Sequence, residues 1–344
     1  MMWCLLKKIK KMSIAIYNTF CGSSNSGDAI IMDAVFEVLC DLFPISHKIS
    51  YPTHYPLSLN AINKAKKSHI SFVGGTNLLS SSISFRSRKN NWAISYLGAM
   101  LLNKHSVLLG CGWKEYQGFP SFMSRLFYKK ILSDRFLHSV RDSYSAQKMN
   151  SVGFENVINT SCPTMWGLSK DHCLSIPRSK CNDVIFTLTD YRPLPKRDAE
   201  VIKLIQKSYR NIYFWAQGSK DISYLSSICD SKSMNMFKII GPDLSSFDAV
   251  LKNNTSIDYV GTRLHAGIRA MQMKKRAVII GIDNRAMEKR KDFNLPVVER
   301  GDIKSLEYII SNSFETDIHL PVENINKWKS QFDSISNIFA TCRV

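Results

Sequence analysis

The feature that most constrains the fold is an alternation of short apolar runs with helical stretches, which begins near residue 13 and occurs in two rounds. Ser106–Gly110 has the pattern of a buried parallel strand, and Phe122–Leu132 has that of the helix after it. Strands that alternate with helices at this spacing form parallel sheets with helices on both faces. We therefore predict an α/β protein with two Rossmann-like, doubly wound parallel-sheet domains.

The expected elements of the first round are strands at Ser13–Phe20, His47–Tyr51, His69–Val73, Ser106–Gly110, Phe136–Val140 and Val157–Thr160, and helices at Asp28–Leu42, Asn91–Leu102, Phe122–Leu132 and Ser143–Ser151. Those of the second are strands at Asp183–Thr189, Asn211–Ala216, Phe237–Ile240, Asp258–Gly261 and Ala277–Ile282, and helices at Lys196–Tyr209, Ile222–Cys229, Ser245–Lys252 and Leu264–Met273. Doubly wound sheets bind ligands at the carboxyl ends of their strands. We therefore expect a ligand-binding cleft between the two domains.

A polar, aperiodic segment at Leu168–Asn182, which contains Pro177, separates the two rounds and is typical of a linker. The predicted organisation is a basic N-terminal extension at 1–12, a first domain at 13–168, a linker at 169–182, a second domain at 183–320 and a C-terminal segment at 321–344. Within that last segment, Ile325–Phe339 has the pattern of an amphipathic helix, which we expect to pack back on the first domain.

Composition narrows the class of protein. A chain of 344 residues is long for one core, so two domains are the natural expectation. It has no run of 18 apolar residues, and the opening MMWCLLKKIKK places its charges after the apolar stretch, the wrong order for a signal peptide. We expect a cytoplasmic protein, with Met12 as an alternative start. The nine scattered cysteines form no C-x-x-C pair, which argues against a disulfide framework and a zinc site. No metal is expected.

The formal net charge is +18. A Lys-rich solvated surface explains this charge, and so would an anionic membrane face, a polyanionic small substrate or nucleic acid. The basic residues are spread along the chain, without a zinc-finger, RNP-type or basic-zipper pattern. Nucleic acid is therefore not an expected partner.

Two small-residue segments of the first domain follow predicted strands. In segment 22–28 (GSSNSGD), Asn25 and Gly27 would let backbone N–H groups and a helix end approach an anion or a sugar hydroxyl, with Asp28 at the start of the helix. The alternative is a tight turn in which Asp28 complements the helix dipole. Segment 74–77 (Gly74, Gly75, Thr76 and Asn77) is either a turn or a place where backbone approaches a ligand closely.

Two further segments carry cations at strand-to-helix junctions. In segment 139–145 (SVRDSYS), the guanidinium of Arg141 could grip a phosphate or carboxylate, or could form a structural ion pair with an Asp. In segment 261–267 (GTRLHAG), Arg263 ends a strand and His265 lies in the first turn of the next helix. An arginine and a histidine two residues apart at such a junction suggest a bound anion and a proton donor.

Taken together, these motifs resemble the polysaccharide pyruvyl transferase family. The matching pieces are Asn25-Ser26-Gly27-Asp28 (N-x-G-D), Gly74-Gly75, Ser139-Val140-Arg141-Asp142 with Ser145, and Arg263-Leu264-His265. They occur in the family's order from about Ser13 to Asp292. Two family motifs differ here: Gly-Asp-Pro appears as Ser161-Cys162-Pro163, and Gly-Val-Pro as Lys275-Arg276-Ala277.

The resemblance implies a two-domain fold like that of GT-B glycosyltransferases, with phosphoenolpyruvate as donor and no cofactor. The product would be a pyruvate ketal on a sugar of a cell-surface polysaccharide or its lipid-linked precursor, such as an exopolysaccharide, O-antigen or capsule. Arg141, Arg263, Leu264, Asn25, Gly27 and segment 74–77 would then bind substrate. His265 is the candidate general acid, and Asp28 is the candidate for gripping or deprotonating the acceptor hydroxyls.

Two other functions remain open at the sequence level. A GT-B glycosyltransferase that uses a nucleotide sugar also needs Arg and N–H contacts to a diphosphate, and Glu288 could hold the ribose hydroxyls. A catalytically silent homologue that acts as a binding subunit would explain the missing Gly-Asp-Pro. An acceptor linked to lipid would give the basic segment Lys7–Lys11 a role in peripheral contact with the anionic inner face of the plasma membrane.

Overall fold

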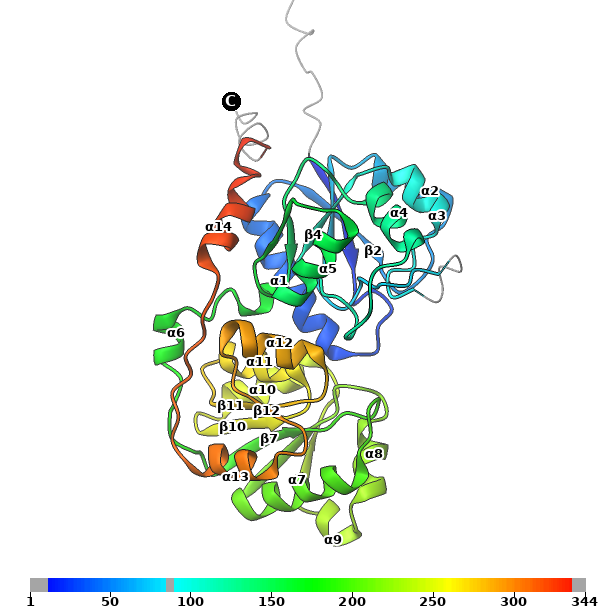
Figure 1. Cartoon of the computed structure of the whole chain (residues 1–344). Helices are drawn as coiled ribbons and strands as arrows, with labels where there is room; N and C mark the ends of the chain where they lie inside the picture. Colours follow the sequence, from blue (N-terminus) through cyan, green and yellow to red (C-terminus); the bar gives the residue numbers. More distant parts are fainter. Residues whose placement is uncertain (1–11, 85–89, 336–344) are drawn as a thin grey trace, which may run out of the picture. The chain divides into compact units, whose positions relative to one another are not determined.

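A computed structural model describes residues 12–84 and 90–335, which form two compact units (Figure 1). The N-terminal unit takes the described parts of Met1–Gly22, Met32–Pro163 and Pro321–Val344. The C-terminal unit takes Ser23–Ile31 and Thr164–Leu320. No helix among the described residues is both long enough and apolar enough to cross a membrane.

The N-terminal unit contains a parallel sheet in the order β2-β1-β3-β4. Its strands are β1 (Ser13–Asn18), β2 (His47–Pro52), β3 (Ile70–Gly74) and β4 (Ser106–Leu109), and β5 (His138–Val140) pairs with β6 (Val157–Asn159). A bridge between Cys111 and Val140 joins the end of β4 to β5. The chain reverses its direction across the sheet between β1 and β3. This switch point is where sheets of this kind bind ligands.

The helices of this unit are α1 (Ser26–Leu42), whose first turns belong to the C-terminal unit, with α2 (Leu59–Lys66), α3 (Tyr96–Leu102), α4 (Phe122–Ile131), α5 (Ser143–Val152) and α14 (Val322–Ser330). One core cluster gathers buried side chains that include Tyr17, Trp92 and Phe127. The ring of Phe72 on β3 also contacts Trp328 of α14, with 6.1 Å between their centroids. The segment after residue 320 therefore completes the packing of this unit.

The C-terminal unit has a six-stranded parallel sheet in the order β12-β11-β10-β7-β8-β9. Its strands are β7 (Asp183–Thr187), β8 (Asn211–Trp215), β9 (Phe237–Ile240), β10 (Ile257–Gly261), β11 (Ala277–Gly281) and β12 (Val297–Glu299). Its helices are α6 (Lys170–Leu174), α7 (Pro195–Ser208), α8 (Asp221–Ile228), α9 (Ser231–Met234), α10 (Leu244–Asn253), α11 (Leu264–Gln272), α12 (Asn284–Phe293) and α13 (Ile303–Ser311). The switch point lies between β7 and β10.

Helices cover both faces of this sheet: α10, α11 and α12 lie on one side, and α7 and α13 on the other (Figure 1). Each face has its own apolar core, one with Trp215 stacked on Phe247 at 4.1 Å and the other with Phe186 and Ile205. Strands buried on both faces explain the continuous apolar runs of the sequence. The predicted α/β fold with doubly wound parallel sheets is confirmed.

Several elements differ from expectation. The helix predicted over Asn91–Leu102 begins only at Tyr96, because Ser95 caps it by accepting a hydrogen bond from the N–H of Gly98 at 3.0 Å. The predicted linker contains α6, and its Cys173 is buried in a core of the C-terminal unit. Six labelled elements were not predicted from the sequence: α2, α6, α9, α12, β12 and α13.

The predicted first domain, 13–168, does not coincide with the N-terminal unit. Within that range, Ser23–Ile31 and Thr164–Leu168 cluster with the C-terminal unit. In the C-terminal segment, α14 ends at Ser330, before the predicted end of the helix at Phe339. Residues 336–344 lie outside the described part of the chain. Residues 1–11, with the basic stretch Lys7–Lys11, also lie outside it.

Candidate anion-binding site

The junction of β10 and α11 lies beside the switch point of the C-terminal unit. Arg263 is the N-cap of α11, and its side chain does not cap the first N–H groups of the helix. His265 is the second residue of the helix and is buried, and Leu264 packs in the apolar core. The positive end of α11 therefore lies at the carboxyl edge of the sheet, where it favours an anion.

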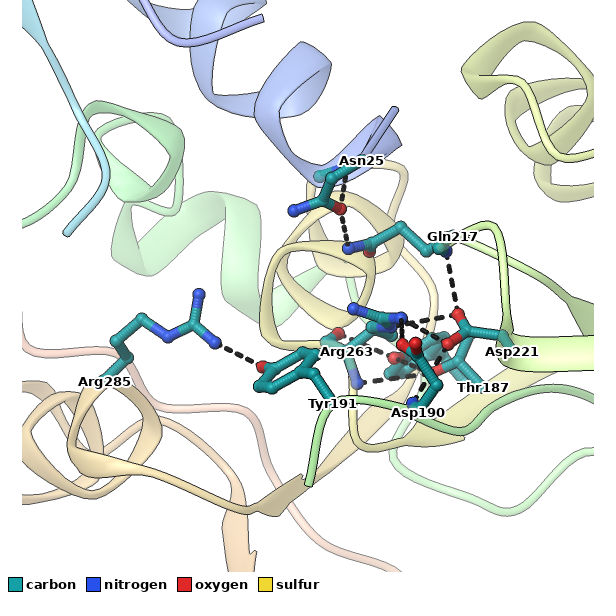
Figure 2. A network of polar contacts seen from close by, with 11 residues as sticks. Asn25, Thr187, Asp190, Tyr191, Gln217, Asp221, Arg263 and Arg285 are labelled. Carbon is teal, nitrogen blue, oxygen red and sulfur yellow. Dashed lines mark hydrogen bonds and ion pairs between the residues drawn. The ribbon is translucent and has the colours of Figure 1, made fainter. Parts of the chain in front are cut away.

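Two carboxylates hold the guanidinium of Arg263 (Figure 2). Its Nε donates to Oδ2 of Asp221 at 3.1 Å, and its Nη2 donates to Oδ1 of Asp221 and, at 3.3 Å, to Oδ1 of Asp190. Asp221 is fully buried, and it also accepts a hydrogen bond from the N–H of Gly218 at 2.8 Å. Burial raises the pKa of Asp221, and the positive charge of Arg263 opposes that rise. This bidentate pair fixes the direction of the guanidinium.

Tyr191 lies between two arginines. The Cζ atom of Arg263 is 5.2 Å from the centre of the Tyr191 ring, and the hydroxyl of Tyr191 accepts a hydrogen bond from Nη2 of Arg285 at 2.5 Å. Arg285, in the first turn of α12, also donates to Oδ2 of Asp283 from Nε at 2.9 Å and from Nη2 at 2.6 Å. Figure 2 shows Arg263 and Arg285 on either side of the Tyr191 ring.

Three buried side-chain oxygens follow the strands around the switch point. Thr189 Oγ1, Gln217 Oε1 and Thr262 Oγ1 follow β7, β8 and β10, and none has a hydrogen-bond partner among the described residues. Buried polar atoms in folded proteins are nearly always paired, with protein or with ordered water. Their grouping at one sheet edge is what a polar ligand or bound water would explain.

The segment that precedes α1 contacts Gln217. Asn25 Oδ1 accepts hydrogen bonds from Nε2 of Gln217 at 2.8 Å and from the N–H of Gly27 at 3.1 Å. A Cβ atom on Gly27 would lie 2.5 Å from Nε2 of Gln217, so a larger residue there would push the Gln217 amide aside. The carboxylate of Asp28 is buried and accepts a hydrogen bond from the hydroxyl of Ser23 at 2.6 Å. The structure thus brings Asn25 and Gly27 against a residue that also lies at the edge of this sheet.

In the N-terminal unit, segment 74–77 ends β3 at the switch point. A Cβ on Gly74 would lie 3.1 Å from Val35 of α1, while Gly75 and Thr76 have φ angles of 58° and 54°. Asn77 Oδ1 is buried and has no partner among the described residues. The turn is therefore strained at Thr76, because a threonine rarely adopts a positive φ.

Arg141 forms a structural ion pair with an Asp, which was the sequence-based alternative to anion binding. Its side chain is almost fully buried, and Nε donates to Oδ2 of Asp142 at 2.9 Å. Asp142 in turn caps α5 by accepting from the N–H of Ser145 at 2.7 Å. A side chain at Gly112 would overlap the guanidinium of Arg141. The ion pair with Asp142 is present, and a role for Arg141 in substrate binding stays a prediction.

Five residues of the site were not predicted from the sequence: Asp190, Tyr191, Gln217, Asp221 and Arg285. Four of them follow strands β7, β8 and β11 directly, so the rule that selected Arg263 would also have found them. Asp221 begins α8, and only its contact with Arg263 identifies it. Within residues 12–84 and 90–335, no three His, Cys, Asp or Glu side chains gather as a metal site.

The fold and this sheet edge define a GT-B-like α/β protein. Its structure is similar to the S. aureus MnaA–UDP co-structure (TM-score 0.51, 15% identity, 82% of each chain covered). It is also similar to UDP-N-acetylglucosamine 2-epimerase from Rickettsia bellii (TM-score 0.52, 11% identity, 95% of this chain and 96% of that chain). No curated protein matches the sequence.

The sequence of the chain identifies the family within this fold class. The family model for polysaccharide pyruvyl transferase matches residues 25–284, which extend from the segment before α1 to the start of α12. The chain belongs to the polysaccharide pyruvyl transferase family. The resemblance drawn from the motifs is thereby confirmed.

Proposed function

We propose that this protein transfers the enolpyruvyl group of phosphoenolpyruvate to two hydroxyls of a sugar, forming a pyruvate ketal during the synthesis of a cell-surface polysaccharide. Family membership supports a transferase. The observation that carries the proposal is the junction of β10 and α11, where a carboxylate-fixed Arg263 and a buried His265 lie at the N-terminus of the helix. An anionic donor that must be protonated needs both an anion anchor and an acid at one place.

The chemistry assigns a role to each residue. His265 delivers a proton to the terminal vinyl carbon of the donor, and C2 becomes an oxocarbenium-like centre. A sugar hydroxyl attacks C2 and loses its proton, with Asp28 as the proposed acceptor of that proton. The C2–O bond to phosphate then breaks, and a second hydroxyl closes the ketal and loses its proton. The products are the ketal and inorganic phosphate, and no metal or organic cofactor is needed.

The protonation state of His265 follows from two opposing effects. The N-terminus of α11 favours neutral imidazole, whereas an adjacent anionic donor favours the protonated form. The full charge of a bound donor at short range outweighs the partial charge of the helix end. His265 is therefore protonated in the donor complex, as a general acid requires.

The acceptor is a sugar or a lipid-linked oligosaccharide, and the N-terminal unit is the proposed acceptor side. The strained turn at segment 74–77 supports this assignment, because backbone strain at a sheet's switch point is typical of binding sites. Arg141, Asn25, Gly27 and Leu264 complete the proposed substrate-binding residues. Leu264 also packs in the apolar core and so holds segment 261–267 in place.

Incubation with phosphoenolpyruvate and a panel of glycans tests the proposal. We expect release of inorganic phosphate and a glycan whose mass has increased by one pyruvyl group. Release of a nucleoside diphosphate from a sugar nucleotide would instead identify a glycosyltransferase. Binding of glycan without turnover of either donor would identify a silent binding subunit.

A further inference from the structure

We propose that Arg285, held by Tyr191 and Asp283, is the second cationic anchor of the donor site and pairs with Arg263. The inference rests on the proposed function and adds a residue to it. Phosphoenolpyruvate carries a phosphate and a carboxylate on one carbon, so a site for it needs two separate cationic groups. Arg263 supplies one of them, and the sequence motifs left the other to Arg141.

The sheet places Arg263 and Arg285 after two neighbouring strands. Strands β10 and β11 are neighbours in parallel register, with Gly261 opposite Ile279. Arg263 follows the end of β10, and Arg285 lies in the first turn of the helix after β11. Both arginines contact the same side chain, because Tyr191 offers its ring to Arg263 and its hydroxyl to Arg285. One aromatic residue thus spaces the two guanidinium groups.

Each guanidinium keeps one nitrogen available. Arg285 uses Nε and Nη2 in its contacts with Asp283 and Tyr191, and Arg263 uses Nε and Nη2 in its contacts with Asp221 and Asp190. Nη1 of either arginine makes no hydrogen bond to any described residue. Figure 2 shows the second terminal nitrogen of Arg285 directed away from the Tyr191 hydroxyl. Two Nη1 groups remain as donors for a ligand.

Arg285 is also more accessible than Arg141. The side chain of Arg285 is 19% exposed, and that of Arg141 is 3% exposed, beneath the backbone of Gly112. Asp283 accepts two hydrogen bonds from Arg285, so the guanidinium is already oriented before a ligand binds. A fixed, partly exposed guanidinium loses little conformational freedom when it binds an anion.

Calorimetric titration with phosphoenolpyruvate tests the assignment. Arg285→Gln should weaken binding by about tenfold or more, because it removes a charge-assisted hydrogen bond. Arg290→Gln, at an exposed position in the last turn of the same helix, removes the same charge and should bind like the wild type. Tyr191→Phe keeps the ring and removes only the hydroxyl contact of Arg285, which Asp283 still holds, so its affinity should lie between those of the wild type and Arg285→Gln.

Equal affinities of Arg285→Gln and Arg290→Gln would overturn the assignment. If Arg285→Gln does not fold, Arg285→Lys replaces it: this variant keeps the charge and loses the fork, so wild-type affinity would again overturn the assignment. If the wild-type protein does not bind phosphoenolpyruvate, the proposed function fails. Titration with UDP then tests separately whether Arg285 belongs to an anion site. Loss of UDP binding in Arg285→Gln supports the paired anion site, and unchanged or absent UDP binding overturns it.

Discussion

At the scale of single residues, a substitution of His265 distinguishes a catalytic role of this side chain from a packing role. His265→Asn keeps a similar shape and one hydrogen bond but cannot act as an acid near neutral pH. General acid catalysis contributes roughly 10²–10⁴-fold, so kcat should fall by about that factor while donor affinity is largely retained. Steady-state phosphate release and donor titration measure the two effects. A lower melting temperature with unchanged kcat per folded molecule would remove His265 from the mechanism.

Asp190 is expected to compete with the donor for Arg263. Its carboxylate makes one contact to Nη2 at 3.3 Å and is 25% exposed, whereas Asp221 is fully buried. Asp190→Asn removes the competing charge, so donor affinity should rise by about two- to fivefold, the range for partly exposed ion pairs. Asp221→Asn should have the opposite effect, because it frees Arg263 from its bidentate partner. Weaker donor binding in Asp190→Asn would instead make Asp190 part of the binding site.

The sequence identified part of this site for a physical reason. Arg263 and His265 lie two residues apart in one junction, so local spacing is enough to relate them. Tyr191 follows another strand and Asp221 begins α8, and only the folded domain brings them to Arg263. The ion pair of Arg141 is again local, because its partner Asp142 is the next residue in the chain. This pair could therefore be recognised as an alternative from the sequence alone.

At the scale of elements, His138 on β5 predicts a dependence of stability on pH. Its Nε2 donates to the carbonyl of Ser133 at 2.7 Å, and its Nδ1 accepts from the N–H of Leu108 at 3.2 Å, so the buried ring is neutral. Burial lowers the pKa of His138 from 6.5 to about 4. Between these values the unfolded chain binds the proton and the folded chain does not. Stability therefore falls as pH falls through this window.

The expected loss from His138 between pH 7 and pH 5 is about 2 kcal/mol of unfolding free energy. Urea denaturation at both pH values measures it, and His138→Gln should reduce the difference between them by that amount. Burial also lowers the pKa of His105, which is present in both proteins and so cancels in the comparison. The same pH dependence in both proteins would contradict the assignment to His138.

Two of the helices missed from the sequence, α2 and α6, share a cause. α2 and α6 are short helices that bury only one or two side chains each, namely Ile62 and Ala65 in α2 and Cys173 in α6. So few buried residues give no detectable period. The predicted helix over 91–102 fails at its start for the opposite reason, because Trp92 and Ile94 are buried in the core as irregular chain. Long strands buried on both faces, by contrast, were predicted correctly.

At the scale of the whole molecule, the net charge of +18 predicts contact with anionic membranes if the acceptor is lipid-linked. Each Lys or Arg near such a surface contributes about 1 kcal/mol. Co-sedimentation with vesicles should require anionic lipid and should decrease as salt increases. Replacing Lys7, Lys8, Lys10 and Lys11 with glutamine should weaken it, with neutral vesicles as the control. No binding at low salt would leave the charge as a solvated surface.

The packing of α14 on β3 has a consequence for the order of events on the ribosome. Phe72 is translated long before Trp328 and Phe332, whose rings lie 6.1 and 5.4 Å from it in the finished protein. The nascent N-terminal unit must therefore wait for the entire C-terminal unit to be synthesised before this face of its sheet is covered. Apolar surface left open during elongation is prone to aggregation. We therefore expect the yield of folded protein to depend more on aggregation during synthesis than on the equilibrium stability of the finished protein.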